Sequence, residues 1–167
     1  MFHVLPDQFL IFCFLALLAW AACSDAIEFE IPNTVNLGIA ALYPLYVFMA
    51  PHSVPWLWSV AVACATLGAG FGLFAKGYFG GGDVKMISAA ALWAGPQLIF
   101  PMLIVISIAG GALALLVLAF HWMQRRRATA GVDASLTAGA YAARARLPYG
   151  VAIAAGAGLV GLRLLAG

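Results

Sequence analysis

Residues 96–122 read PQLIFPMLIVISIAGGALALLVLAFHW, a stretch that contains no Asp, Glu, Lys or Arg. This stretch is longer than the roughly 20 residues that an α-helix needs to cross a bilayer. The rest of the chain is similar, because 65% of its 167 residues are hydrophobic and only 8% are charged, against about 25% charged in a soluble domain. Continuous apolar runs favour helices over a β-barrel. The sequence therefore predicts an all-α polytopic membrane protein.

Short breaks rich in Pro, Gly or polar residues divide the chain into about six predicted transmembrane helices. Their approximate bounds are 4–24, a second that follows Pro32-Asn33 and runs to 50, then 55–75, 83–95, 96–122 and 148–165. The fourth segment is short for a complete crossing. We expect a single transmembrane domain over residues 1–167, whose one sizeable polar loop is a basic stretch at about 123–147.

The distribution of basic residues predicts the orientation of these helices. Five of the eight Lys and Arg residues lie between residues 125 and 146, and basic loops stay on the cytoplasmic side. We therefore expect this loop inside and the N-terminus outside. Asp25 at the end of the first helix and Asp83 at the start of the fourth should then meet at the cytoplasmic membrane boundary. Tyr149, at the start of the last helix, is expected to be an aromatic anchor at the interface.

Several other kinds of site are disfavoured by the sequence. The basic cluster is a topology signal rather than a nucleic-acid site. The cysteine and histidine side chains are scattered and form no CxxC pair: Cys13, Cys23, Cys64, His3, His52 and His121. We therefore predict no disulfide framework, no metal centre and no Ser–His triad, and we expect no cofactor.

The stretch Gly80-Gly81-Gly82-Asp83 is the most informative part of the sequence. Glycines let the backbone bend sharply and let another chain approach closely, so Asp83 would be presented to an extended peptide. The alternative is a flexible turn in which Asp83 caps the fourth helix, because Asp is a favoured N-cap residue. The glycine stretch alone does not separate these two interpretations.

Asp25 and Asp83 together suggest a reaction. Ionisable groups at membrane depth are costly and usually functional. Two carboxylates brought close do not both ionise cheaply, so one keeps a proton and the other acts as a base on a water molecule. That water attacks a carbonyl, and the protonated partner supports the developing oxyanion. The pair therefore predicts an aspartyl peptidase.

Four separated motifs carry a resemblance to a known family. They are Asp25, Ile31-Pro32-Asn33, Gly80-Gly81-Gly82-Asp83-Val84-Lys85 and Leu147-Pro148-Tyr149-Gly150. In combination, and in their order among the helices, they resemble the signature of the type IV prepilin peptidases, which are GxGD aspartyl peptidases. The resemblance covers nearly the whole chain. The compact length of the chain is similar to that of the family members that process Flp or Tad pilins.

This resemblance implies both a function and a set of site residues. The implied function is a membrane aspartic endopeptidase that removes the basic leader of Flp/Tad-type prepilins at the cytoplasmic face of the bacterial inner membrane. Pilus-assembly machinery is a further expected partner. The implied catalytic pair is Asp25 and Asp83. The implied substrate-binding and loop residues are Gly80, Gly81, Gly82, Lys85, Pro32 and Asn33.

The chain departs from the family pattern in two ways. Larger members have an N-terminal domain with paired CxxC motifs, which is associated with N-methylation of the pilin. This chain has no CxxC, so we expect no methyltransferase activity. Glu28 and Glu30 stand where the family usually has basic residues. They either attract the Lys or Arg of a leader or form a solvated loop without a role, and the second interpretation is the simpler one.

A different class of function is also compatible with paired aspartates. A transporter subunit or an assembly scaffold could use them as an ion or proton site. A transport site is expected near the bilayer midplane, between broken helices. The predicted position of Asp25 and Asp83 at one membrane face favours the peptidase. An inactive relative kept as a scaffold would retain the same two residues.

Overall fold

The computed structural model describes residues 6–128 and 147–166, and every element within these ranges is an α-helix. The helices are α1 (Pro6–Glu28), α2 (Asn33–Met49), α3 (Trp56–Ala75), α4 (Gly81–Ala128) and α6 (Tyr149–Ala166). The predicted all-α class is confirmed. Four of these helices are long and apolar enough to cross a membrane, namely α1, α3, α4 up to Phe120, and α6. The predicted count of about six crossings is not confirmed.

The difference in count has two physical causes. α2 has only 17 residues, which is at the lower limit of about 17 for a span. The segments predicted at 83–95 and 96–122 are two helices that meet at Gly95 (φ 55°, ψ −168°), a residue outside helical geometry, and together they form the element α4. Glycine adopts this left-handed φ without steric cost, and Pro96 then removes a backbone donor. The predicted boundary at Gly95-Pro96 is therefore confirmed, and the count of crossings is lower because α4 up to Phe120 is taken as one apolar span.

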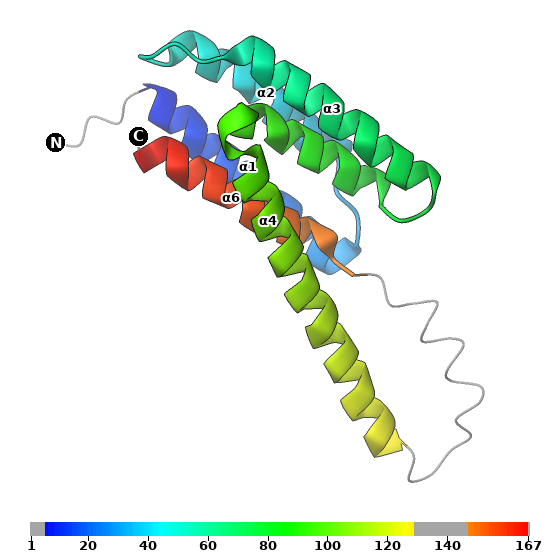
Figure 1. Ribbon diagram of the computed structural model, residues 1–167. Coiled ribbons are helices and arrows are strands. Elements are labelled where there is room, and N and C mark those ends of the chain that lie inside the picture. The colour runs from blue at the N-terminus through cyan, green and yellow to red at the C-terminus, as the bar shows by residue number, and fades with distance from the viewer. Residues whose placement is uncertain (1–5, 129–146, 167) are drawn as a thin grey trace, which may run out of the picture.

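The second half of α4 extends beyond the other helices (Figure 1). It continues to Ala128, past the end predicted near residue 122. The remainder of the predicted basic loop, residues 129–146, lies outside the described residues.

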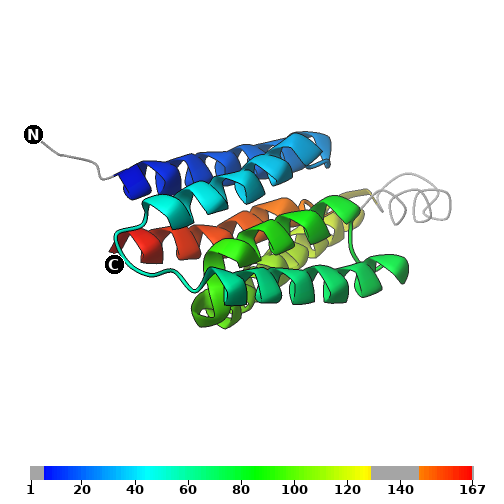
Figure 2. The same cartoon turned by 90° about the horizontal axis from the view of Figure 1, so that it is seen from above.

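α6 lies between α1 and α4 (Figure 2). Two of its glycines allow this close packing. A Cβ at Gly156 would lie 2.7 Å from the backbone oxygen of Met102 in α4, and a Cβ at Gly161 would lie 2.6 Å from Leu15 Cδ2 in α1. Small residues are typical of close helix contacts in membranes. α6 therefore connects α1 to α4, because it packs closely against both helices.

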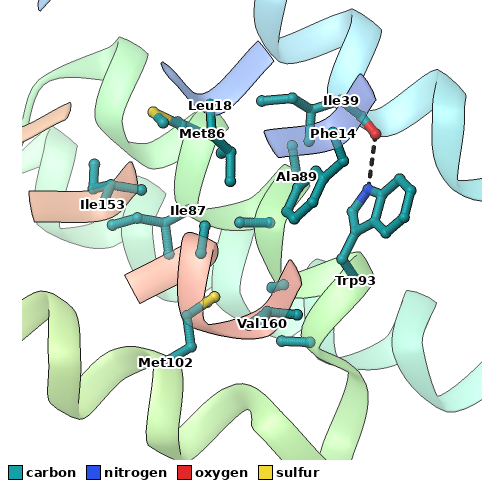
Figure 3. Packing of buried hydrophobic residues seen from close by; sticks show 14 of the residues in the cluster. Phe14, Leu18, Ile39, Met86, Ile87, Ala89, Trp93, Met102, Ile153 and Val160 are labelled. Carbon is teal, nitrogen blue, oxygen red and sulfur yellow. Dashed lines mark hydrogen bonds between the residues drawn. The ribbon is translucent and has the colours of Figure 1, made fainter. Parts of the chain in front are cut away.

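Trp93 of α4 lies at the centre of the packing between α1, α2 and α4 (Figure 3). Its ring stacks on Phe14 of α1 with a centroid distance of 4.4 Å. Its indole nitrogen donates a hydrogen bond of 3.0 Å to the backbone oxygen of Ile39 in α2. Tyr43 and Tyr46 of α2 approach the same ring at 5.8 and 5.1 Å. One side chain thus fixes the positions of three helices.

The end of α1 and the starts of α2, α4 and α6 gather at one end of the bundle (Figures 1 and 2). The described N- and C-terminal ends of the chain lie at the opposite end. Asp25 near the end of α1 and Asp83 near the start of α4 are thereby brought to the same end of the molecule, as the helix order predicted. The side of the membrane on which this end lies stays a prediction.

Candidate active site

A pocket with a volume of about 720 Å³ opens at this end of the bundle. Its walls come from the end of α1, the α3–α4 link, the start of α4 and the start of α6. The lining residues are Asp25, Phe29, Glu30, Ile31, Gly77, Tyr78, Phe79, Gly80, Gly81, Gly82, Asp83, Leu147 and Tyr149. Three of them are acidic, and none of these described residues is basic. The pocket therefore favours a positively charged ligand.

Asp25 is held near the last turn of α1. Its side chain is buried, with 6% of the residue exposed. Its Oδ2 accepts a hydrogen bond of 2.6 Å from the backbone N–H of Gly150, the second residue of α6. The helix ends at Glu28, and the next residue, Phe29, has a φ of 55°, an uncommon value for a residue with a side chain. Asp25 is thus tied to α6 just before the chain turns away.

Asp83 is the third residue of α4, which begins at Gly81. Its carboxylate accepts a hydrogen bond from the backbone of Gly80, as the acidic residue of a capping box does. The Val84 N–H in turn donates to the Gly80 oxygen at 3.2 Å. The two interpretations of the glycine stretch are therefore compatible, because Asp83 supports the helix start and also lines the pocket.

The two aspartates belong to one electrostatic site. Both line the pocket, and the charge of Asp25 acts on the carboxyl group of Asp83. This is the arrangement in which one carboxyl group keeps a proton and the other remains a base. Among the described residues, no three His, Cys, Asp or Glu side chains are grouped as metal ligands.

The Ile31-Pro32-Asn33 motif lies against the start of α4, and of its three residues only Ile31 lines the pocket. Lys85 Nζ donates to Asn33 Oδ1 at 2.8 Å, and Asn36 Nδ2 donates to the Gly82 oxygen at 3.4 Å. A Cβ at Gly82 would lie 3.3 Å from Ile31 Cβ. The link between α1 and α2 and the glycine stretch therefore fit closely, although they are far apart in the sequence.

The site residues predicted from the sequence fall into two groups. Asp25, Asp83 and the three glycines of residues 80–82 line the pocket, whereas Lys85, Asn33 and Pro32 are not among its lining residues. Lys85 is exposed and bonds to Asn33. The bond between Lys85 and Asn33 therefore joins the start of α4 to the start of α2, where the oxygen of Pro32 accepts the first helical hydrogen bonds.

Three further residues at the site, Asn36, Tyr149 and Phe29, were not predicted as site residues from the sequence. Asn36 is buried with 6% exposed, and its only signal was its place one turn after Asn33 on the same helix face. Tyr149, predicted as an interface anchor, also lines the pocket, where its ring lies 5.7 Å from that of Phe79. Phe29 carries no signal in the sequence, because its role depends on where α1 ends.

The chain matches the model of one protein family, described as the type IV leader peptidase family, over residues 11–115. The matched residues contain Asp25, the Ile31-Pro32-Asn33 motif and Asp83, and α6 lies outside them. No curated protein and no solved structure matches the chain.

Proposed function

Because the chain belongs to the type IV leader peptidase family, we propose that it is a membrane aspartic endopeptidase with Asp25 and Asp83 as its catalytic pair. The observation that carries this proposal is the single pocket that both aspartates line at one end of the bundle. Paired aspartates at the midplane would have favoured a transporter. Their place at a bundle end favours an enzyme that receives its substrate from one side of the membrane.

The reaction follows from the chemistry of two neighbouring carboxyl groups. One carboxylate takes a proton from a water molecule, whose oxygen attacks the carbonyl carbon of the scissile peptide bond. The protonated partner donates to the carbonyl oxygen as negative charge develops on it. The carboxyl group that took the water proton then gives it to the amide nitrogen, the C–N bond breaks, and the two peptide products leave as a carboxylic acid and an amine. The stretch of residues 80–82 has no side chains, so an extended peptide backbone can come close to Asp83.

The charge of the pocket supports the choice of substrate. Asp25, Glu30 and Asp83 line it without a basic residue among the described ones. A peptide segment rich in Lys or Arg complements this charge. We therefore propose a prepilin with a basic leader, of the Flp/Tad type, cleaved at the cytoplasmic face of the bacterial inner membrane. The chain has no CxxC motif, which supports cleavage without N-methylation, and the product would pass to the pilus-assembly machinery.

The test is cleavage of a prepilin with a basic leader by the purified full chain in lipid or detergent, read by mass spectrometry. We expect one cut that separates the leader from the mature pilin. A chain that carries both Asp25→Asn and Asp83→Asn serves as the blank. Lack of cleavage by a folded wild-type chain, or equal cleavage by the blank, would contradict the proposal.

Glu30 provides a test of the substrate charge. Glu30 and Glu28, the last residue of α1, are both exposed, but only Glu30 is among the residues that line the pocket. We expect Glu30→Gln to raise KM for a basic leader by roughly fivefold, since a partly exposed ion pair contributes up to about 1 kcal/mol. Glu28→Gln is the matched control and should leave KM unchanged. Equal KM values for both variants and the wild type would assign the two glutamates to a solvated loop.

A further inference from the structure

The hydrogen bond between Gly150 and Asp25 connects the last helix to the site. It joins residues that are 125 positions apart, and its donor–acceptor distance is 2.6 Å. Gly150 and Asp25 are both buried. Gly150 belongs to α6, which lies outside the residues matched by the family model. The backbone N–H of Gly150 in α6 therefore contacts a residue of the proposed catalytic pair directly.

We propose that Gly150 is a positioning residue, whose N–H holds Oδ2 of Asp25 and whose missing side chain makes room for that carboxylate. This inference rests on the proposed catalytic role of Asp25. It adds a residue of α6 to a reaction whose acid and base come from α1 and α4.

The space around Gly150 explains why a glycine stands there. A Cβ at this position would lie 2.8 Å from both Cβ and Oδ2 of Asp25, and 3.0 Å from its Cγ. Contacts below 3.0 Å force one of the groups to move. The crowding comes from the helix backbone of α6 on one side and the buried Asp25 on the other, and neither is the free end of a flexible side chain. Even the smallest side chain at residue 150 therefore displaces the carboxylate or α6.

The position of Gly150 in its helix explains why its N–H is available. The first four N–H groups of an α-helix have no partner within the helix, and Gly150 is the second residue of α6. The N-terminal end of a helix also carries a partial positive charge, which favours a carboxylate. No other described residue is hydrogen-bonded to the Asp25 side chain. Oδ2 is thus committed to α6, and Oδ1 is left to act on the water molecule.

The first test is Gly150→Ala in the purified full chain, with kcat and KM measured on a prepilin with a basic leader. We expect kcat to fall by about 10²-fold, because a displacement of about 1 Å at a reacting group costs that much. KM should change little in comparison, and the melting temperature should fall because the added Cβ crowds buried atoms. A merely structural role would lower stability and leave the kcat of the folded fraction unchanged.

Two other glycines of α6 provide matched controls. Gly158→Ala places a Cβ where no atom lies within 4 Å, and it should behave as the wild type. Gly161→Ala crowds Leu15 Cδ2 at 2.6 Å, which disturbs the same α1–α6 contact away from the pocket. It should lower stability without lowering kcat. Wild-type kcat in Gly150→Ala, or an equal fall in Gly161→Ala, would overturn the inference while the proposed function stands.

The hydrogen bond itself can be measured without activity. Tyr149-Gly150 is the only Tyr-Gly pair in the chain, so ¹³C-carbonyl Tyr and ¹⁵N-Gly labelling isolates one amide signal. We expect the amide proton of Gly150 to resonate far downfield. Asp25→Asn should shift this signal upfield, and Asp83→Asn should shift it much less. This measurement decides the inference if Gly150→Ala does not fold, or if the wild type cleaves no prepilin and the proposed function fails. If the chemical shift of the Gly150 amide proton stays the same in Asp25→Asn, the inference is overturned.

Discussion

Replacing either Asp25 or Asp83 with Asn is expected to lower the rate of leader removal by about 10³-fold or more, while the bundle stays folded. An amide can neither take a proton from water nor give one to the oxyanion, so each variant loses acid–base catalysis. Asn has nearly the same shape as Asp and still offers an oxygen to the N–H groups of Gly150 and Gly80. The loss should therefore appear in kcat rather than in stability.

The double variant sharpens this prediction. Residues that act as one unit are strongly non-additive, so Asp25→Asn with Asp83→Asn should cost little more than either single change. Asp7→Asn, in the first turn of α1, is the control for the loss of one negative charge. The measurement is the single-turnover rate of leader removal. A single Asn variant with the wild-type rate would remove the two-aspartate mechanism.

Trp93→Ala is expected to have the largest effect on stability, about 3–5 kcal/mol less free energy of unfolding. The change removes the stack on Phe14 and the hydrogen bond to Ile39 and leaves a cavity between α1, α2 and α4. Trp93 is 3% exposed, so lipid and water cannot fill the space easily. The measurement is the melting temperature of the full chain in a mild detergent.

Trp58 supplies the control for this substitution. It lies on α3 and is 67% exposed, so Trp58→Ala removes a side chain of the same size without opening a cavity. We expect a shift in melting temperature several times smaller than that of Trp93→Ala. Equal shifts for the two variants would mean that Trp93 does not hold the three helices together.

The sequence was sufficient to predict the helical class and the two aspartates at one end of the bundle. Apolar runs define the helices, and the alternation of helix direction decides which ends gather together. It placed the break between two helices at Gly95-Pro96 but did not define its form, because these residues are compatible with both a loop and a kink. The observed φ of 55° at Gly95 depends on how α4 packs.

The contacts that hold the aspartates could not be read from the sequence. The Leu147-Pro148-Tyr149-Gly150 motif carried a resemblance but no physical role. The bond between Gly150 and Asp25 depends on how the start of α6 packs against the end of α1, and these segments are 125 residues apart. Asn36 was missed for a similar reason, because its partner is a backbone oxygen at Gly82.

The long sequence distance between Asp25 and Gly150 also has a consequence for biosynthesis. α1 and α4, which carry both aspartates, are made before α6, and a contact 125 residues apart can form only after the chain between its two residues has been made. The carboxylate of Asp25 therefore gains its partner only after α1 to α4 have been made. A ribosome-bound intermediate that has inserted α1 to α4 contains both acidic residues but not the completed pocket. Its hydrolytic activity is expected to appear only when the last helix docks.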